Sequence, residues 1–308
     1  MPSRALPFFV LGVGVVVVSF AAILIRFAHA DGAPSLAIAA VRLAIAALVL
    51  APFAWFRAGR EMLRLRRREL GLCMLSGALL AVHFWAWITS LEYTSVASST
   101  ALVTTNPLWV ALASAVLLRE RPGGAAVAGI VLTLAGSVLV FAVDASRAPG
   151  PEAAPMLGNA LALVGAISAS GYLLVGRALR TSLSLTAYIW LAYSTAAILL
   201  LAAAMATGLS LMSVPGTAWG FMVALALGPQ LIGHTTFNWA LRRLTATFVA
   251  VAILGEPVGS ALLAYFFFGE QFSALQFAGF VLLLLGIFVA ARNERLLRQG
   301  SARPDHAV

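Results

Sequence analysis

The chain has 308 residues, of which 62% are apolar and only 10% are charged, and its net charge is +9. An ordinary soluble domain carries roughly 25% charged residues, so this chain lacks the polar groups to cover a soluble surface, and we expect the bilayer to be its solvent. Its basic residues are all arginines that lie mostly between apolar runs, and membrane orientation explains them better than a nucleic-acid partner does. The single cysteine, Cys73, excludes an internal disulfide framework and a cysteine-based metal cluster.

Ten apolar segments are each about 20 residues or longer and are predicted to cross the membrane as helices. Turn signals such as Asp31-Gly32-Ala33-Pro34 separate neighbouring segments. One longer connection, at 144–155, divides the chain into two sets of five. In chain order the predicted helices are 6–28, 35–57, 69–91, 94–118, 122–143, 156–178, 184–206, 215–241, 245–268 and 272–292.

The arginines predict the orientation of these helices. If the N-terminus is cytoplasmic, the connections on the cytoplasmic side hold the arginine clusters, and the external loops hold only Arg147. Positive charge is retained on the cytoplasmic side of membrane proteins, so we expect a multi-pass protein of the bacterial inner (plasma) membrane with both termini in the cytoplasm. The clusters are 57–68, 119–121, 177–180, 242–243 and 292–303.

The two halves of the chain match at an offset of 150 residues. The matched pairs are Pro107 with Pro257, Glu120 with Glu270, Gly129 with Gly279 and Gly136 with Gly286. Because each half holds an odd number of helices, the second enters the membrane from the opposite side, as in many secondary transporters. We therefore predict an all-α integral membrane protein of ten transmembrane helices in two inverted five-helix repeats. The expected units are repeats at 1–143 and 156–292, a periplasmic connection at 144–155 and a cytoplasmic tail at 293–308.

Pro107 and Pro257 lie near the middle of the fourth and ninth predicted helices. Proline lacks the N–H that would bond to the carbonyl four residues earlier, which here belongs to Val103 or Ile253. A freed carbonyl is costly in hydrocarbon but tolerable beside a polar cavity. Either proline alone could be a simple packing kink. The matched pair favours two hinges around a central site.

The sequence resembles the drug/metabolite transporter superfamily, in particular its EamA-type ten-helix members, and among these the YddG-type exporters of aromatic and other amino acids. This resemblance implies export of metabolites from the cytoplasm through a central cavity. The residues that carry it are Arg42-Leu43, Tyr93-Thr94-Ser95, Asn106-Pro107, Arg119-Glu120-Arg121, Phe237-Asn238-Trp239-Ala240-Leu241, Glu256-Pro257 and Gly269-Glu270.

Polar side chains inside the membrane are expensive and therefore candidates for function. In the eighth helix, Gln230, His234 and Asn238 recur every four residues and share one face. We expect this face to meet protein or water rather than lipid, with His234 contributing most to a transport path. A structural role for His234 between helices is the alternative. In the third helix, His83 and Trp87 also share a face, and packing and cavity lining are both open for them.

The remaining candidates lie in the second, fourth, sixth and ninth helices. Glu256 is the acidic residue expected near the membrane centre, and a structural pair of Arg42 with Glu256 or Asp31 is left open. For an amino acid substrate, Glu256 or the face of an aromatic ring would hold the ammonium group, and Asn106, Gln230 or a histidine would donate to the carboxylate. The predicted substrate-binding residues are completed by Thr105, Asn106, Trp109, Ser168 and Tyr172, of which Ser168 also fits a small-residue packing face.

These features predict a secondary transporter that exports amino acids, aromatic and other neutral ones, and related metabolites by alternating access. An exporter of drugs, nucleosides or sugars is the alternative within this class, and a channel or scramblase is less favoured. An intramembrane enzyme is disfavoured because the four histidines form no HExxH pair and the membrane centre holds no paired carboxylates. We expect no cofactor, no bound metal and no obligate protein partner. Passive transport and proton coupling both fit.

Overall fold

The computed structural model describes residues 5–93, 99, 102, 103, 105–113, 116, 123–145, 154–269 and 273–300, and every regular element in these ranges is a helix. Nearly half of the predicted helix at 94–118, the centre of the 144–155 connection, the end of the tail, and both Glu120 and Glu270 lie outside them. The elements are α1 Leu6–Ala30, α2 Ser35–Leu63, α3 Arg67–Tyr93, α5 Asn106–Ala113, α6 Gly124–Ala145, α7 Pro155–Leu179, α8 Leu185–Ala206, η2 Leu211–Ser213, α9 Gly216–Leu225, η3 Ala226–His234, α10 Thr235–Ala240, α11 Ala246–Ile253, α12 Gly255–Phe268 and α13 Ala274–Gly300.

The helices are apolar and long enough to cross a bilayer. Within the described ranges, seven helical stretches meet both conditions, and shorter apolar helices span Gly124–Leu139 and Ala274–Ala290. Large apolar side chains such as Phe56 and Phe266, which are 85% and 76% exposed, point away from the protein. Such exposure is unfavourable in water and expected against lipid tails. The predicted all-α membrane fold with two related halves is confirmed.

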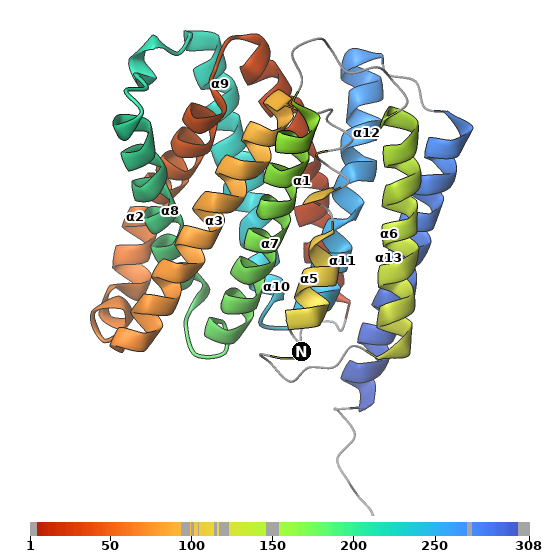
Figure 1. Ribbon diagram of the computed structural model, residues 1–308. Coiled ribbons are helices and arrows are strands. Elements are labelled where there is room, and N and C mark those ends of the chain that lie inside the picture. The colour runs from red at the N-terminus through yellow and green to blue at the C-terminus, as the bar shows by residue number, and fades with distance from the viewer. Residues whose placement is uncertain are drawn as a thin grey trace, which may run out of the picture.

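The helices pack with the symmetry of two related halves. In Figure 1, α6 and α13, the last helix of each half, lie side by side at one edge of the bundle. Likewise α2 packs on α8, its counterpart in the second half, and α3 packs on α7 as η3 packs on α1. Exchanging every helix for its counterpart leaves these pairings unchanged. The packing therefore supports the repeat inferred from the sequence.

Glycines bring the backbones of α6 and α13 together. A Cβ on Gly129 would lie 2.8 Å from the carbonyl oxygen of Gly286, and one on Gly136 would lie 2.6 Å from that of Gly279. These are the four glycines that match at the 150-residue offset. Gly129 approaches Gly286, the counterpart of Gly136, and Gly136 approaches Gly279, the counterpart of Gly129. Small residues permit such close approach between membrane helices.

Both matched prolines follow an interruption of a helix. The predicted helix 245–268 ends as α11 at Ile253, turns at Leu254 and restarts as α12 at Gly255. In the first half, α5 starts at Asn106 after a turn residue, Thr105. Pro107 and Pro257 therefore lie in the first turns of new helices and not in the middle of kinked ones. Proline is well tolerated in a first turn because an N–H there would have no partner within the helix.

The predicted helix at 215–241 is confirmed as one span, Gly216–Ala240, but it is not a regular α-helix throughout. It consists of α9, the π-helical segment η3 and α10, with Pro229 inside η3. Proline disturbs a regular i→i−4 hydrogen-bond pattern, and a π-helical turn accommodates an altered register. Gln230 and His234 therefore project from a π-helical segment, beside the interior that the two halves share.

Candidate functional site

Arg42 is a charged side chain in the interior of the protein. It lies on α2, is 0% exposed, and its Nη2 donates to Oε1 of Gln230 over 3.0 Å. The ring of Phe84 on α3 covers the guanidinium, with its centroid 4.0 Å from Cζ. Because α2 belongs to the first half and Gln230 to the second, this hydrogen bond joins the two repeats. Arg42 and Glu256 interact electrostatically, but the hydrogen-bond acceptor of Arg42 is a neutral amide.

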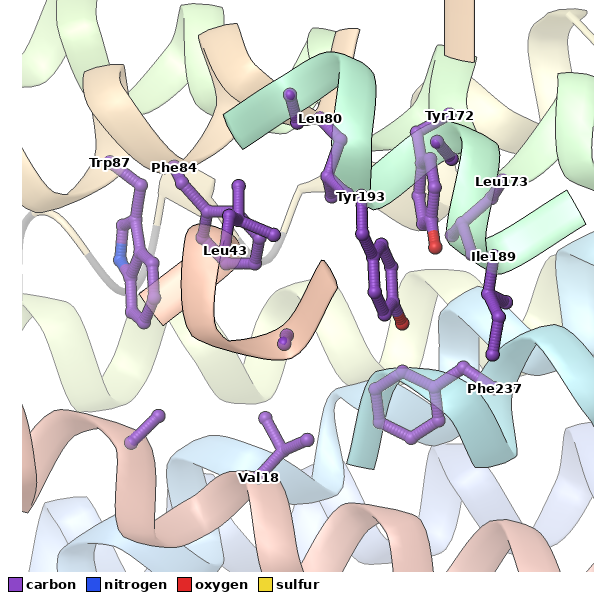
Figure 2. Close-up of a cluster of buried hydrophobic side chains, with 14 of the residues drawn as sticks. Val18, Leu43, Leu80, Phe84, Trp87, Tyr172, Leu173, Ile189, Tyr193 and Phe237 are labelled. Carbon is purple, nitrogen blue, oxygen red and sulfur yellow. The ribbon is translucent and has the colours of Figure 1, made fainter. Parts of the chain in front are cut away.

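Aromatic and imidazole rings from both halves form a row beside Arg42. The ring of Phe84 meets His234 edge-to-face at 5.2 Å, and His234 in turn meets Phe237 at 5.6 Å. On α3, the rings of His83 and Trp87 stack at 6.0 Å. Figure 2 shows Phe84 and Trp87 from α3 above the level of Phe237 from α10, with Tyr172 and Tyr193 alongside. Aromatic side chains of both repeats therefore line the same interior region.

Asn238 and two tyrosines extend the polar part of this region. Asn238 is 0% exposed, and its Nδ2 donates to the hydroxyl of Tyr172 on α7 and, over 2.8 Å, to the carbonyl of His234. The hydroxyl of Tyr193 on α8 lies 3.5 Å from the main-chain carbonyl oxygen of Gln230 and donates to it. The predicted face of Gln230, His234 and Asn238 therefore meets protein, on α2, α3 and α7. We call Arg42, His83, Phe84, Trp87, Tyr172, Tyr193, Gln230, His234, Phe237 and Asn238 the central cluster.

His83 has a structural partner. Its Nδ1 lies 3.0 Å from the carbonyl oxygen of Gly165 on α7. A Cβ added to Gly165 would lie 3.4 Å from Cβ of Trp87. The small residue thus lets α3 and α7 approach closely. Packing accounts for His83 as fully as contact with a solute would. Ser168, which is one turn further along α7, is buried as well.

The predicted residues of α5 are less closely joined to the central cluster. Nε1 of Trp109 donates to Oγ1 of Thr105 over 3.2 Å, and that hydroxyl donates to the carbonyl of Leu102 over 2.7 Å, so both side chains have partners nearby in the chain. Asn106 is buried, and its main-chain carbonyl accepts from Ser170 of α7 over 3.1 Å. Glu256 stands in the first turn of α12 and is half-buried. It reaches the cluster through the electrostatic interaction with Arg42.

Several buried polar atoms of this interior have no hydrogen-bond partner among the described residues. Buried polar groups are paired in the great majority of cases, so a concentration of exceptions is informative. The unpartnered atoms include both donors and acceptors, and a polar solute needs both to bind. The donors are Nε and Nη1 of Arg42, Nε1 of Trp87 and Nε2 of Gln230, the acceptors are Oδ1 of Asn106 and Oδ1 of Asn238, and the hydroxyl of Thr235 can act as either.

The arginine-bearing connections meet at one end of the bundle. Arg177 donates to the carbonyl of Leu241 over 2.6 Å, and the main-chain N–H of Ser184 donates to Glu61 over 2.7 Å. Burial, with the nearby charges of Arg242 and Arg243, lowers the pKa of Arg180 to about 10. The connections between α2 and α3, α7 and α8, and α10 and α11 thus share one side. Their common position agrees with the arginine pattern of the sequence.

The sequence profile of the EamA-like transporter family matches residues 7–142 and 156–292, one copy in each half. The chain belongs to this family. It is similar to YwfM of Bacillus subtilis, an uncharacterized transporter, at 26% identity over 90% of each chain. It is similar to YyaM of the same organism, also an uncharacterized transporter, at 23% identity over 84% of this chain and 85% of that one. This EamA-family protein is thus a multi-pass membrane transporter of the drug/metabolite transporter superfamily.

Two further comparisons agree with this assignment. An uncharacterized transporter of Archaeoglobus fulgidus is 26% identical over 66% of this chain and 70% of its own. A protein of known crystal structure superposes with a TM-score of 0.76 over 96% of this chain and 99% of its own, at 22% identity. At that identity the likeness concerns the fold alone.

Proposed function

We propose that this EamA-family transporter exports amino acids, aromatic and other neutral ones, from the cytoplasm by alternating access, and that the path runs through the central cluster. The observation that carries the proposal is the buried junction of both repeats at Arg42 and Gln230. A charged group, amides and aromatic rings converge there, and each suits a different part of an amino acid. Intramembrane ionisable residues that face a bundle interior commonly mark substrate pathways.

The two repeats provide the elements that alternating access needs. Each half has a helix interruption beside a proline, at Thr105 and Leu254, so both halves can bend at equivalent depths. We propose Pro107 and Pro257 as hinge residues. We place both termini in the cytoplasm and the protein in the bacterial plasma (inner) membrane, as the arginine distribution indicates. The repeats would extend over 1–143 and 156–292.

Counterflow in proteoliposomes tests the substrate class. Vesicles loaded with unlabelled tryptophan, phenylalanine, methionine or threonine should accumulate the labelled form of at least one of them above empty liposomes. Labelled nucleosides and sugars form the comparison set, because an exporter of these solutes is the alternative within this class of transporter. If all four amino acids fail and a nucleoside or sugar is exchanged, the substrate class is wrong and the fold and family stand.

A further inference from the structure

Arg42 carries a charge whose surroundings compensate it only in part. A guanidinium has five N–H donors, and in Arg42 the Nε donor and both Nη1 donors, three in all, have no hydrogen-bond partner among the described residues. The side chain is 0% exposed. Burying a charge is costly unless it is paired and hydrogen-bonded. The Gln230 amide, the face of Phe84 and the electrostatic interaction with Glu256 offset part of this cost.

We propose that Arg42 is the carboxylate-binding residue of this transporter, with Gln230 as the residue that positions the guanidinium, and that a carboxylate is required for high-affinity substrate binding. This inference rests on the proposed function, because it takes the central cluster to be the substrate path. The sequence alone favoured Asn106, Gln230 or a histidine as the donor to the carboxylate.

The geometry around Arg42 favours a carboxylate over other groups. The guanidinium is planar, so its N–H donors point outward within its plane, and Phe84 packs over the group without using them. A carboxylate at the edge of this plane can accept from an unpartnered donor in a charge-assisted hydrogen bond. Nε2 of Gln230 is attached to the amide carbon whose Oε1 accepts from Arg42, so it supplies another unpartnered donor beside the charge. An uncharged amide would add no negative charge beside the guanidinium, and an ammonium group would be repelled by it.

The rest of the substrate would meet the aromatic residues. The rings of Phe84, His234 and Phe237 continue from the guanidinium in a chain of edge-to-face contacts. An apolar or aromatic substituent suits these rings. A carboxylate held by both Arg42 and Gln230 would contact one residue of each repeat. The predicted ligands are therefore small carboxylates with an apolar or aromatic side chain.

Binding of matched ligands to the purified full-length protein tests this assignment. Two series are compared by competition with a labelled amino acid: phenylalanine, phenylalaninamide, 2-phenylethylamine and 3-phenylpropionate, and methionine with methioninamide. Losing a hydrogen bond to a charged group weakens affinity by about 10- to 150-fold. We expect that loss for the amides and the amine, and we expect phenylpropionate to retain the contribution of the carboxylate.

Two variants separate recognition from folding. Arg42→Gln should bind acid and amide alike, with the affinity of the acid lowered to that of the amide, while Arg42→Lys should keep part of the preference because it keeps the charge but not the planar donors. Arg60→Gln is the matched control, since Arg60 is exposed on the same helix, and its ligand preference should equal that of the wild type. Monodisperse elution of each variant establishes that it is folded.

The outcomes distinguish this inference from the proposed function. Equal affinity of the wild type for phenylalanine and phenylalaninamide, or an unchanged acid preference in folded Arg42→Gln, would overturn the role of Arg42 and leave amino acid export intact. If Arg42→Gln does not fold, the wild-type ligand series decides alone. If no ligand of either series binds and a nucleoside or sugar is exchanged, the proposed function fails and the inference fails with it.

Discussion

Replacing Gly136 by alanine tests the close packing of α6 on α13. The new Cβ would lie 2.6 Å from the carbonyl oxygen of Gly279 and 2.8 Å from the main-chain nitrogen of Leu283. Both are backbone atoms, so the helices must separate. Such overpacking costs about 1–3 kcal/mol, whereas alanine in a helix is about 1 kcal/mol better than glycine where space is free. Gly286→Ala should behave alike, since its Cβ would lie 2.7 Å from the carbonyl oxygen of Gly129.

Gly71→Ala is the matched control, because Gly71 lies within α3 and a Cβ there would meet nothing within 4 Å. We expect both α6–α13 variants to unfold several degrees below this control. The assay is thermal unfolding of the proteins in one detergent at one scan rate, since membrane proteins commonly unfold irreversibly and apparent midpoints then depend on the rate. Midpoints of Gly136→Ala and Gly286→Ala equal to that of Gly71→Ala would refute the glycine-mediated packing.

Two further predictions concern the site and the topology. His234→Ala should lower counterflow strongly. It should lower the free energy of unfolding by only about 1–3 kcal/mol, the value of two aromatic contacts, here with Phe84 and Phe237. A loss of activity no larger than the loss of folded protein would instead indicate a structural role, and a stable, fully active variant would contradict both roles. Reporter fusions after Arg68 and after Val308 should read cytoplasmic and one near Pro149 periplasmic, whereas a periplasmic C-terminus would contradict the inverted arrangement.

The helices were predictable because hydropathy and length dominate in a membrane. The apolar run at 35–57 can be identified without any tertiary contact. The helix α2 continues beyond it to Leu63, because hydropathy marks only the apolar part of a helix and not its arginine-bearing end. The repeat was predictable because a proline, a glutamate and two glycines of the first half all match their counterparts at one offset without a gap. The interruption at Leu254 and the π-helix η3 were not, because their exact form depends on how the neighbouring helices satisfy the freed backbone groups.

The candidate site was predictable only in part. The burial of Gln230 and Asn238 followed from the cost of polar groups in lipid. The importance of Arg42 did not follow, because its partner lies 188 positions away and no local pattern encodes that register. Tyr193 was missed for the same reason, although a tyrosine inside the apolar run of α8 was a signal that could have been read. Thr105 and Trp109 hydrogen-bond to each other, and their predicted contact with substrate stays a prediction.

Chemical labelling of position 234 tests most directly whether the transport path runs through the central cluster. Cys73 is the only cysteine and is buried, so Cys73→Ser provides a background into which His234→Cys introduces a single thiol. We predict that a membrane-impermeant thiol reagent modifies this cysteine from either side of the membrane in oriented vesicles, and that a transported amino acid slows the reaction from both. A thiol that stays unmodified from both sides, or reacts at a rate that no transported amino acid changes, would contradict the account.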